Sequence, residues 1–101
     1  MIVYNLSIKV DRSIQHKWMN WQRTEFIPSI IATGSFTEYK FFHLLDQDES
    51  DGFTYVLQCF SKSVSHYQEY IRVHANNILS NAMKKWNNQI LVFGTAMEVL
   101  Q

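Results

Sequence analysis

The chain has 101 residues, of which 47% are hydrophobic and 15% aromatic, values typical of one globular domain and far from disorder. Nine basic and nine acidic residues leave no net charge. The excess of Lys and Arg that nucleic-acid binders and membrane-surface patches need is therefore missing. The single Cys59 cannot form an internal disulfide, which favours a reducing compartment. Because there is no basic leader and no apolar run near the roughly 20 residues that cross a bilayer, we expect a cytoplasmic protein.

The first third of the chain predicts a strand followed by a helix. Residues 2–10 alternate between apolar and more polar positions, which is the period of a strand with one buried face. Asp11 and Ser13 then offer N-caps for a helix. Because Pro28 has no backbone N–H to donate, we expect this helix to stop or kink just before it. Gly34 is expected to end the segment.

A hairpin is predicted in the middle of the chain. Residues 36–45 and 53–60 each have the aromatic and β-branched composition of a strand. The polar residues 46–52 between them end in Asp-Gly and predict an exposed loop between antiparallel strands. This acidic loop does not fit a calcium loop of the EF-hand type, which needs Gly at its sixth position and Glu at its twelfth. The chain has Asp51 and Leu57 there.

A second helix and a last strand complete the order of elements. Ser61 and Ser63 offer caps for a long helix, in which the poor helix formers Asn76-Asn77 and Ser80-Asn81 predict a kink or break. Residues 89–99 predict the final strand. The order β-α-β-β-α-β over a single domain, residues 1–101, predicts an α+β ferredoxin-like fold. In this fold two helices cover one face of a four-stranded antiparallel sheet.

The composition of the strands predicts a homodimer. A sheet with helices on one face should be polar at alternate positions on the other face, and residues 2–10 follow this rule. Residues 39–45, 53–60 and 90–93 are apolar on both faces instead. Such strands are usually covered on both faces, so we expect the sheet of a second copy to cover the face that the helices leave bare. The alternative is a monomer with scattered exposed aromatic side chains.

The histidines and the cysteine form no recognisable metal or catalytic motif. His66 and His74 are eight residues apart in the predicted second helix, roughly 12 Å of rise, which is too far for two ligands of one ion. His16 and His43 fall on other elements, and Cys59 has neither a second thiol nor a histidine near it in sequence. We therefore expect no metal and no cofactor.

Six residues are candidates for a ligand pocket in the groove between helices and sheet: Asn5, Trp18, Trp21, Tyr67, Tyr70 and His74. Asn5 is the polar interruption of the first strand. The two tryptophans are three residues apart on a helix, as are the two tyrosines, so each pair shares a helix face and could wall a flat ligand. His74 lies on the apolar stripe of its helix, where an imidazole could act as a general base or axial ligand. For each candidate the alternative is ordinary packing in the core or in a dimer.

Short patterns along the chain carry a resemblance to a known family: Trp18-x-x-Trp21, Ile27-Pro28, Thr33-Gly34-x-Phe36-Thr37-Glu38, the opening Met1-Ile2-Val3-Tyr4-Asn5 and the closing Met97-Glu98-Val99-Leu100. The chain resembles a family of short bacterial proteins known as domain-of-unknown-function family 4286. The resemblance spans essentially the whole chain and implies the dimeric α+β-barrel version of the ferredoxin-like fold. It implies no reaction, because the family has none that can be carried across.

That wider structural group includes small oxygenases and haem-degrading enzymes. A haem-degrading site of this type resembles an Asn on the first strand with a Trp and a His ten residues apart on the second helix. Asn5 matches the first position, but ten residues before His74 stands Val64. The leading hypothesis is therefore a dimer that is not an enzyme, or is one only cryptically, and that binds a small apolar ligand. A small-molecule oxygenase and a protein-interaction or regulatory module are the alternatives.

Overall fold

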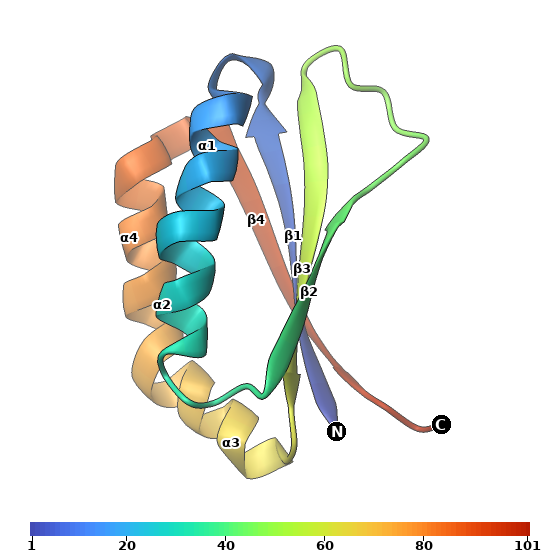
Figure 1. The fold of residues 1–101 in the computed structure, drawn as a ribbon, viewed down its shortest axis with the longest axis vertical. Coiled ribbons are helices and arrows are strands. Elements are labelled where there is room, and N and C mark those ends of the chain that lie inside the picture. The colour runs from blue at the N-terminus through green and yellow to red at the C-terminus, as the bar shows by residue number, and fades with distance from the viewer.

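A four-stranded antiparallel sheet with helices on one face forms the fold, as predicted (Figure 1). The computed structural model describes residues 1–101. The strands are β1 (Ile2–Asp11), β2 (Glu38–His43), β3 (Gly52–Ser61) and β4 (Ile90–Glu98). Their order in the sheet is β2-β3-β1-β4, so β1 and β3 are central and β2 and β4 form the edges. Each crossover passes over the same face, which leaves the other face of the sheet without a helix.

The first helical segment continues through Pro28, so the predicted stop does not occur, and a π turn lies where a stop or kink was expected. It consists of a 3₁₀ turn, η1 (Arg12–Ile14), then α1 (Gln15–Trp21), a π-helical turn, η2 (Gln22–Phe26), and α2 (Ile27–Ile31). The wide π turn lies directly before the proline and carries the helix across the position that cannot donate. Asp11 caps the start by accepting from the Ser13 backbone N–H at 2.9 Å. Gly34 ends the segment at a φ of 76°, as predicted.

The second helical segment is also continuous, so the predicted kink or break takes the form of a π turn that ends directly before Asn76, without a break in the helix. It consists of α3 (Val64–Glu69), a π turn, η3 (Tyr70–Ala75), and α4 (Asn76–Trp86). Ser63 caps it, with its Oγ accepting from the His66 backbone N–H at 3.3 Å. Buried Ala82 and Trp86 hold α4 against the rest of the core, and this packing outweighs the weak helix propensity of Asn76 and Asn77. A short turn, η4 (Asn87–Gln89), leads into β4.

The hairpin forms as predicted, although β2 is shorter than expected. Phe36 leaves the strand to enter the core, where its ring lies 4.8 Å from that of Tyr70 and 6.1 Å from that of Tyr4. At the start of β3, Gly52 is required by space, because a Cβ there would lie 2.3 Å from the carbonyl oxygen of Val10. The acidic loop between β2 and β3 extends beyond the sheet (Figure 1).

The hydrophobic core lies between the sheet and the helices. From β1 it receives Tyr4, Leu6, Ile8 and Val10, and these pair across the sheet with Tyr55, Leu57 and Cys59 of β3 and their neighbours. The first helical segment contributes a stripe of buried side chains at four-residue spacing: Ile14, Trp18, Gln22, Phe26 and Ile30. Gln22 is the only polar member of this stripe.

Candidate functional site

The face of the sheet that carries no helix, here called the open face, presents alternate residues of all four strands. In the register of the sheet Lys40 of β2 pairs with Gln58 of β3, Gln58 with Asn5 of β1, and Asn5 with Thr95 of β4. Alternate side chains of a strand lie on one face, so these four form a polar row across the sheet. Gln58 Nε2 donates to Asn5 Oδ1 at 3.3 Å and joins the two central strands within the row.

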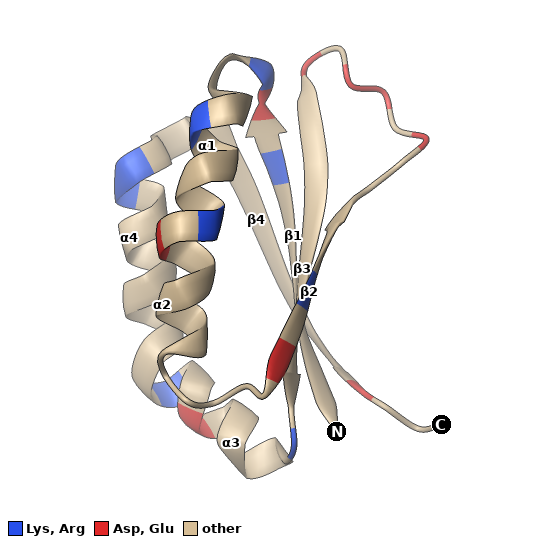
Figure 2. Ribbon diagram, in the orientation of Figure 1, with Lys and Arg blue, Asp and Glu red and all other residues tan.

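Apolar side chains of the open face flank this polar row on both sides. On one side Phe42, Val56 and Phe93 share a row with Ser7, and Leu91 lies beyond it beside Lys9. On the other side Phe60, Val3 and Met97 share a row with Glu38. Phe93 is 66% exposed, Leu91 54%, Met97 45% and Phe42 44%. Figure 2 shows charge on β1 and β2, where Lys9, Glu38 and Lys40 lie on the open face, whereas β4 carries a charged residue only at its last position, Glu98. A monomer rarely leaves so many large apolar side chains together in water.

The structure places five of the six predicted pocket residues on the helix side of the sheet. Trp18 and Tyr70 are fully buried, while Trp21, Tyr67 and His74 are half-buried. Trp18 stacks on Tyr55 with 5.1 Å between ring centroids. Asn5 is separated from the other five, because it lies in the polar row on the open face.

The five helix-side residues do not form one group, and Trp18 packs apart from the others on Tyr55 and Phe41. Tyr67 and Tyr70 both pack on the ring of Tyr4, at 5.9 and 5.5 Å between centroids. The His74 ring lies 6.1 Å from that of Tyr70. Trp21 instead packs edge-on against Trp86 at 5.7 Å, alongside Phe26. The aromatic pairs therefore fill the core in the way their ordinary packing alternative predicts.

Three buried side chains of the core have polar atoms without a hydrogen-bond partner: Gln22, Tyr70 and Trp86, whose indole N–H is unpaired. Both amide atoms of Gln22 and the hydroxyl of Tyr70 are unpaired, and both residues are 0% exposed. Gln22 and Tyr70 are also the first residues of the two π turns, η2 and η3. Unpaired buried polar groups are rare, and π turns occur frequently at functional sites.

Burial changes the proton affinity of the groups around Tyr4. It raises the pKa of Tyr4 to about 12, with further contributions from Tyr67 and Cys59. It also raises the pKa of Tyr70 and raises that of the Cys59 thiol to about 12. Cys59 is 1% exposed, and burial of this kind makes a thiol a poor nucleophile.

The surface has four hollows, all open to solvent. One of about 240 Å³ between the two helical segments is lined by Trp21, the only predicted pocket residue that borders a hollow. A polar hollow of about 220 Å³ lies beside Gly34 and Lys62, and an apolar one of about 360 Å³ lies between α4 and β4. The fourth, of about 320 Å³, lies at the β2 edge of the open face and is lined by Phe42, His43, Leu44, Val56 and Gln58. No enclosed chamber separates the helices from the sheet.

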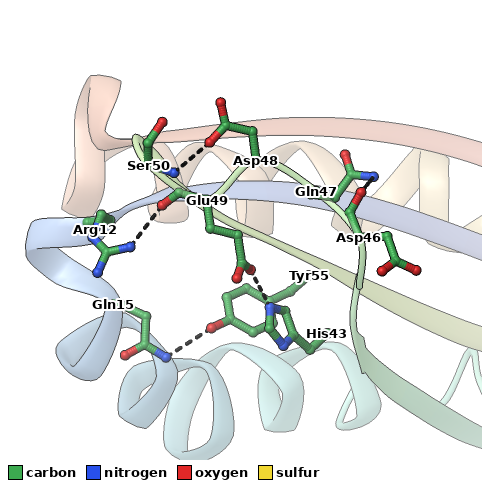
Figure 3. A network of polar contacts seen from close by, with 9 residues as sticks. All are labelled: Arg12, Gln15, His43, Asp46, Gln47, Asp48, Glu49, Ser50 and Tyr55. Carbon is green, nitrogen blue, oxygen red and sulfur yellow. Dashed lines mark hydrogen bonds and ion pairs between the residues drawn. The ribbon is translucent and has the colours of Figure 1, made fainter.

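A network of polar contacts fastens the acidic loop to the end of the sheet (Figure 3). Arg12 Nη1 donates to the Glu49 carbonyl oxygen at 2.8 Å, and His43 Nε2 lies 2.6 Å from Glu49 Oε2. Gln15 Nε2 donates to the Tyr55 hydroxyl at 2.9 Å below the loop. No three His, Cys, Asp or Glu side chains lie close enough together to hold a metal ion. The network joins the loop to Arg12 and to the end of β2 at His43.

The sequence did not predict the polar row, nor that Gln22 is buried without a hydrogen-bond partner. Lys40, Gln58 and Thr95 become neighbours of Asn5 only through the register of the strands, which no single strand contains. Gln22 had a signal, since it falls four residues from both Trp18 and Phe26 on the apolar stripe.

The fold defines the chain as an α+β protein of the ferredoxin-like class. The model of a family described as "Domain of unknown function (DUF4286)" matches residues 1–100, and the chain belongs to that family. Among curated proteins there is no significant match. No helix is long and apolar enough to span a membrane.

Solved structures share this fold at low sequence identity. An ethyl tert-butyl ether D (EthD) family protein from Bacillus halodurans C-125 is 13% identical, with a TM-score of 0.71 over 99% of this chain and 100% of that one. SnoaB, a cofactor-independent oxygenase from Streptomyces nogalater, is 8% identical, with a TM-score of 0.66 over 99% and 94%. A dimeric ferredoxin-like protein of unknown function from Jannaschia sp. CCS1 is 17% identical, with a TM-score of 0.55 over 98% and 100%. These likenesses show the fold, and the function of the family is unknown.

Proposed function

We propose that this chain is a homodimeric module in which two copies pack their open faces together and close an α+β barrel. The observation that carries the proposal is the open face itself, where the large apolar side chains Phe42, Phe93 and Met97 lie exposed on the two sides of the polar row. Water-exposed aromatic surface of this kind is stabilised by burial at about 25 cal/mol per Å². The Jannaschia protein, which shares this fold, is dimeric, and this supports a dimeric state for the chain.

The size of the open face fits a stable dimer. Strands about 4.8 Å apart with a rise of about 3.3 Å per residue make a four-stranded face of roughly 600 Å². Two copies would bury about 1,200 Å² or more, since side chains add to the flat area. This lies at the lower end of the range for specific interfaces, which start near 1,200 Å² in total.

The test is the molar mass in solution, measured by size-exclusion chromatography with light scattering. We expect a dimer at micromolar concentration. Asn5→Asp places a carboxylate from each copy inside the sheet-to-sheet interface and is expected to dissociate it. Asn77→Asp makes the same chemical change on the exposed side of α4 and should leave the dimer intact. A wild-type monomer at these concentrations would overturn the proposal.

A second candidate function is binding of a small apolar ligand between helices and sheet. The unpaired amide of Gln22 and hydroxyl of Tyr70 favour it, because a ligand with one hydrogen-bonding group could satisfy either. Trp18, Trp21, Tyr67 and His74 would supply the apolar walls, and binding would require the core to open. An oxygenase-like reaction at this place would depend on His74, because Asn5 lies on the opposite face of the sheet.

This second candidate is tested by titrating the protein with a hydrophobic dye, 1-anilinonaphthalene-8-sulfonate, and with haem. The ligand hypothesis predicts saturable binding that weakens in His74→Ala and Tyr70→Phe. Binding that is absent in the wild type, or unchanged in both variants, would remove it.

A further inference from the structure

The two edges of the open face carry complementary shapes at the same level along the strands. At the β2 edge lies the hollow of about 320 Å³ lined by Phe42, Leu44, Val56 and Gln58. At the β4 edge projects Phe93, the most exposed aromatic side chain of the sheet at 66%. Phe42 pairs with Val56, Val56 with Ser7 and Ser7 with Phe93, so the hollow and the phenyl ring occupy one row of the sheet.

The two possible aligned packings of a symmetric dimer treat this row differently. A two-fold axis parallel to the strands places β2 of one copy over β4 of the other and keeps each row opposite itself. The Phe93 ring of each copy then faces the hollow of the other copy, so the dimer contains this contact twice. An axis perpendicular to the strands and along the polar row places β2 over β2 instead. In this second packing Phe93 faces the partner's row that contains Met97. The hollow of each copy then faces the same row of the partner and receives no Phe93 ring.

The polar row distinguishes the same two packings by its charge. With the axis parallel to the strands, Lys40 lies opposite Thr95 of the partner, and Gln58 lies opposite Asn5 of the partner, an amide pair that can hydrogen-bond both ways. With the perpendicular axis, Lys40 lies opposite Lys40 of the partner, and two ammonium groups meet at one end of a buried row. Shape and charge therefore select the same arrangement.

We infer that the dimer has its two-fold axis parallel to the strands, with Phe93 of each copy seated in the hollow of the other's β2 edge and the two polar rows superposed. This inference rests on the proposed homodimer and specifies which residues meet in it. The polar row sets the register, because a slip along the strands would bury Lys40, Gln58, Asn5 and Thr95 against apolar rows.

A size swap between the ring and the hollow tests the arrangement. Phe93→Ala removes the ring, and Val56→Phe fills the hollow from within; each is expected to raise the dimer dissociation constant at least about 100-fold, because each acts twice in the dimer. The double variant returns one aromatic ring to each contact and is expected to recover at least about a tenth of the wild-type affinity. Circular dichroism confirms that each variant is folded. Val73→Ala removes an exposed apolar side chain from the helical layer, outside the open face, and serves as the matched control that should leave the dimer unchanged.

A charge introduced at the other end of the polar row gives an independent measurement. Thr95→Glu faces Lys40 of the partner in the inferred arrangement, so it should tighten the dimer at low salt relative to Thr95→Gln, and the gain should shrink as salt rises. In the perpendicular packing the two new carboxylates would face each other and weaken the dimer. Suppose that Asn5→Asp dissociates the dimer, but that the double variant does not recover affinity and Thr95→Glu does not tighten binding. These results would overturn the inferred arrangement while still supporting the homodimer. A wild-type monomer would overturn both.

Discussion

Replacing Gln22 by methionine should stabilise the protein, which is unusual for a substitution in a core. The side chain is 0% exposed, and neither its Oε1 nor its Nε2 has a partner. An unpaired buried amide costs about 1–3 kcal/mol in proteins. Methionine is similar in length and volume and has comparable helix propensity, so it removes the unpaired groups without opening a cavity. The free energy of unfolding should therefore rise by about 1–3 kcal/mol.

The assay is thermal unfolding by circular dichroism at one fixed protein concentration, because a dimer makes Tm depend on concentration. An unfolding entropy of about 2.1 cal/mol/K per residue gives about 0.2 kcal/mol/K for a chain of 101 residues, so Tm should rise by roughly 5–15 °C. Gln15→Met is the matched control with the opposite sign, since Gln15 donates to the Tyr55 hydroxyl at 2.9 Å. Removing that bond should lower stability by about 0.5–1.5 kcal/mol. A lower Tm for Gln22→Met would refute the reasoning and show that the amide has a partner in solution, such as an internal water or a ligand.

Three further predictions concern the thiol, alkaline pH and the helix end. Cys59 should react with a thiol reagent only as fast as the protein unfolds. Burial raises its pKa from 9.0 to about 12, which lowers the thiolate fraction near neutral pH about a thousandfold. Fast reaction of the folded protein would contradict this prediction. The pKa of Tyr4 is 10.0 when unfolded and about 12 when folded, so its contribution to stability is complete below pH 10 and is lost as pH rises toward 12. Between pH 10 and 12, the free energy of unfolding measured by urea titration should therefore fall less in Tyr4→Phe than in the wild type. An equal fall in the two proteins would contradict this prediction. Gly34→Ala should cost about 1 kcal/mol through its φ of 76°, whereas Gly34→Asn should cost less, and equal Tm values for the two variants would argue against a backbone origin.

The element order and the fold were accessible from the sequence because they depend on local patterns. The alternation in residues 2–10, the cap at Ser63 and the Asp-Gly before β3 are each contained in a few neighbouring residues. The continuity of both helices was not accessible. Pro28 and the pair Asn76-Asn77 predict interruptions when only propensity is considered, yet π turns and packing against the sheet carry the helices past them.

The candidate site depended on information that no single segment contains. Asn5 was identified as a polar interruption, but its side of the sheet and its neighbours follow from pairing with Gln58 and Thr95, more than 50 residues away. The two apolar faces of β3 and β4 did predict a covered surface, and the open face has this character. Which parity faces the helices became clear only when the register related Leu57 and Tyr55 to Leu6 and Ile8 of β1.

The two edges of the sheet differ in their risk of forming fibrils. β2 has six residues and includes Glu38 and Lys40, charges of the kind that discourage another strand from adding to an edge. β4 lacks such charges, because residues 89–97 contain no charged residue and no proline. No strand pairs with the outer edge of β4. An uncharged, β-branched and aromatic segment at a free edge is the signature of a template for cross-β growth. Variants that separate the copies should therefore aggregate through β4 at high concentration, and a lysine within this segment would be the natural remedy.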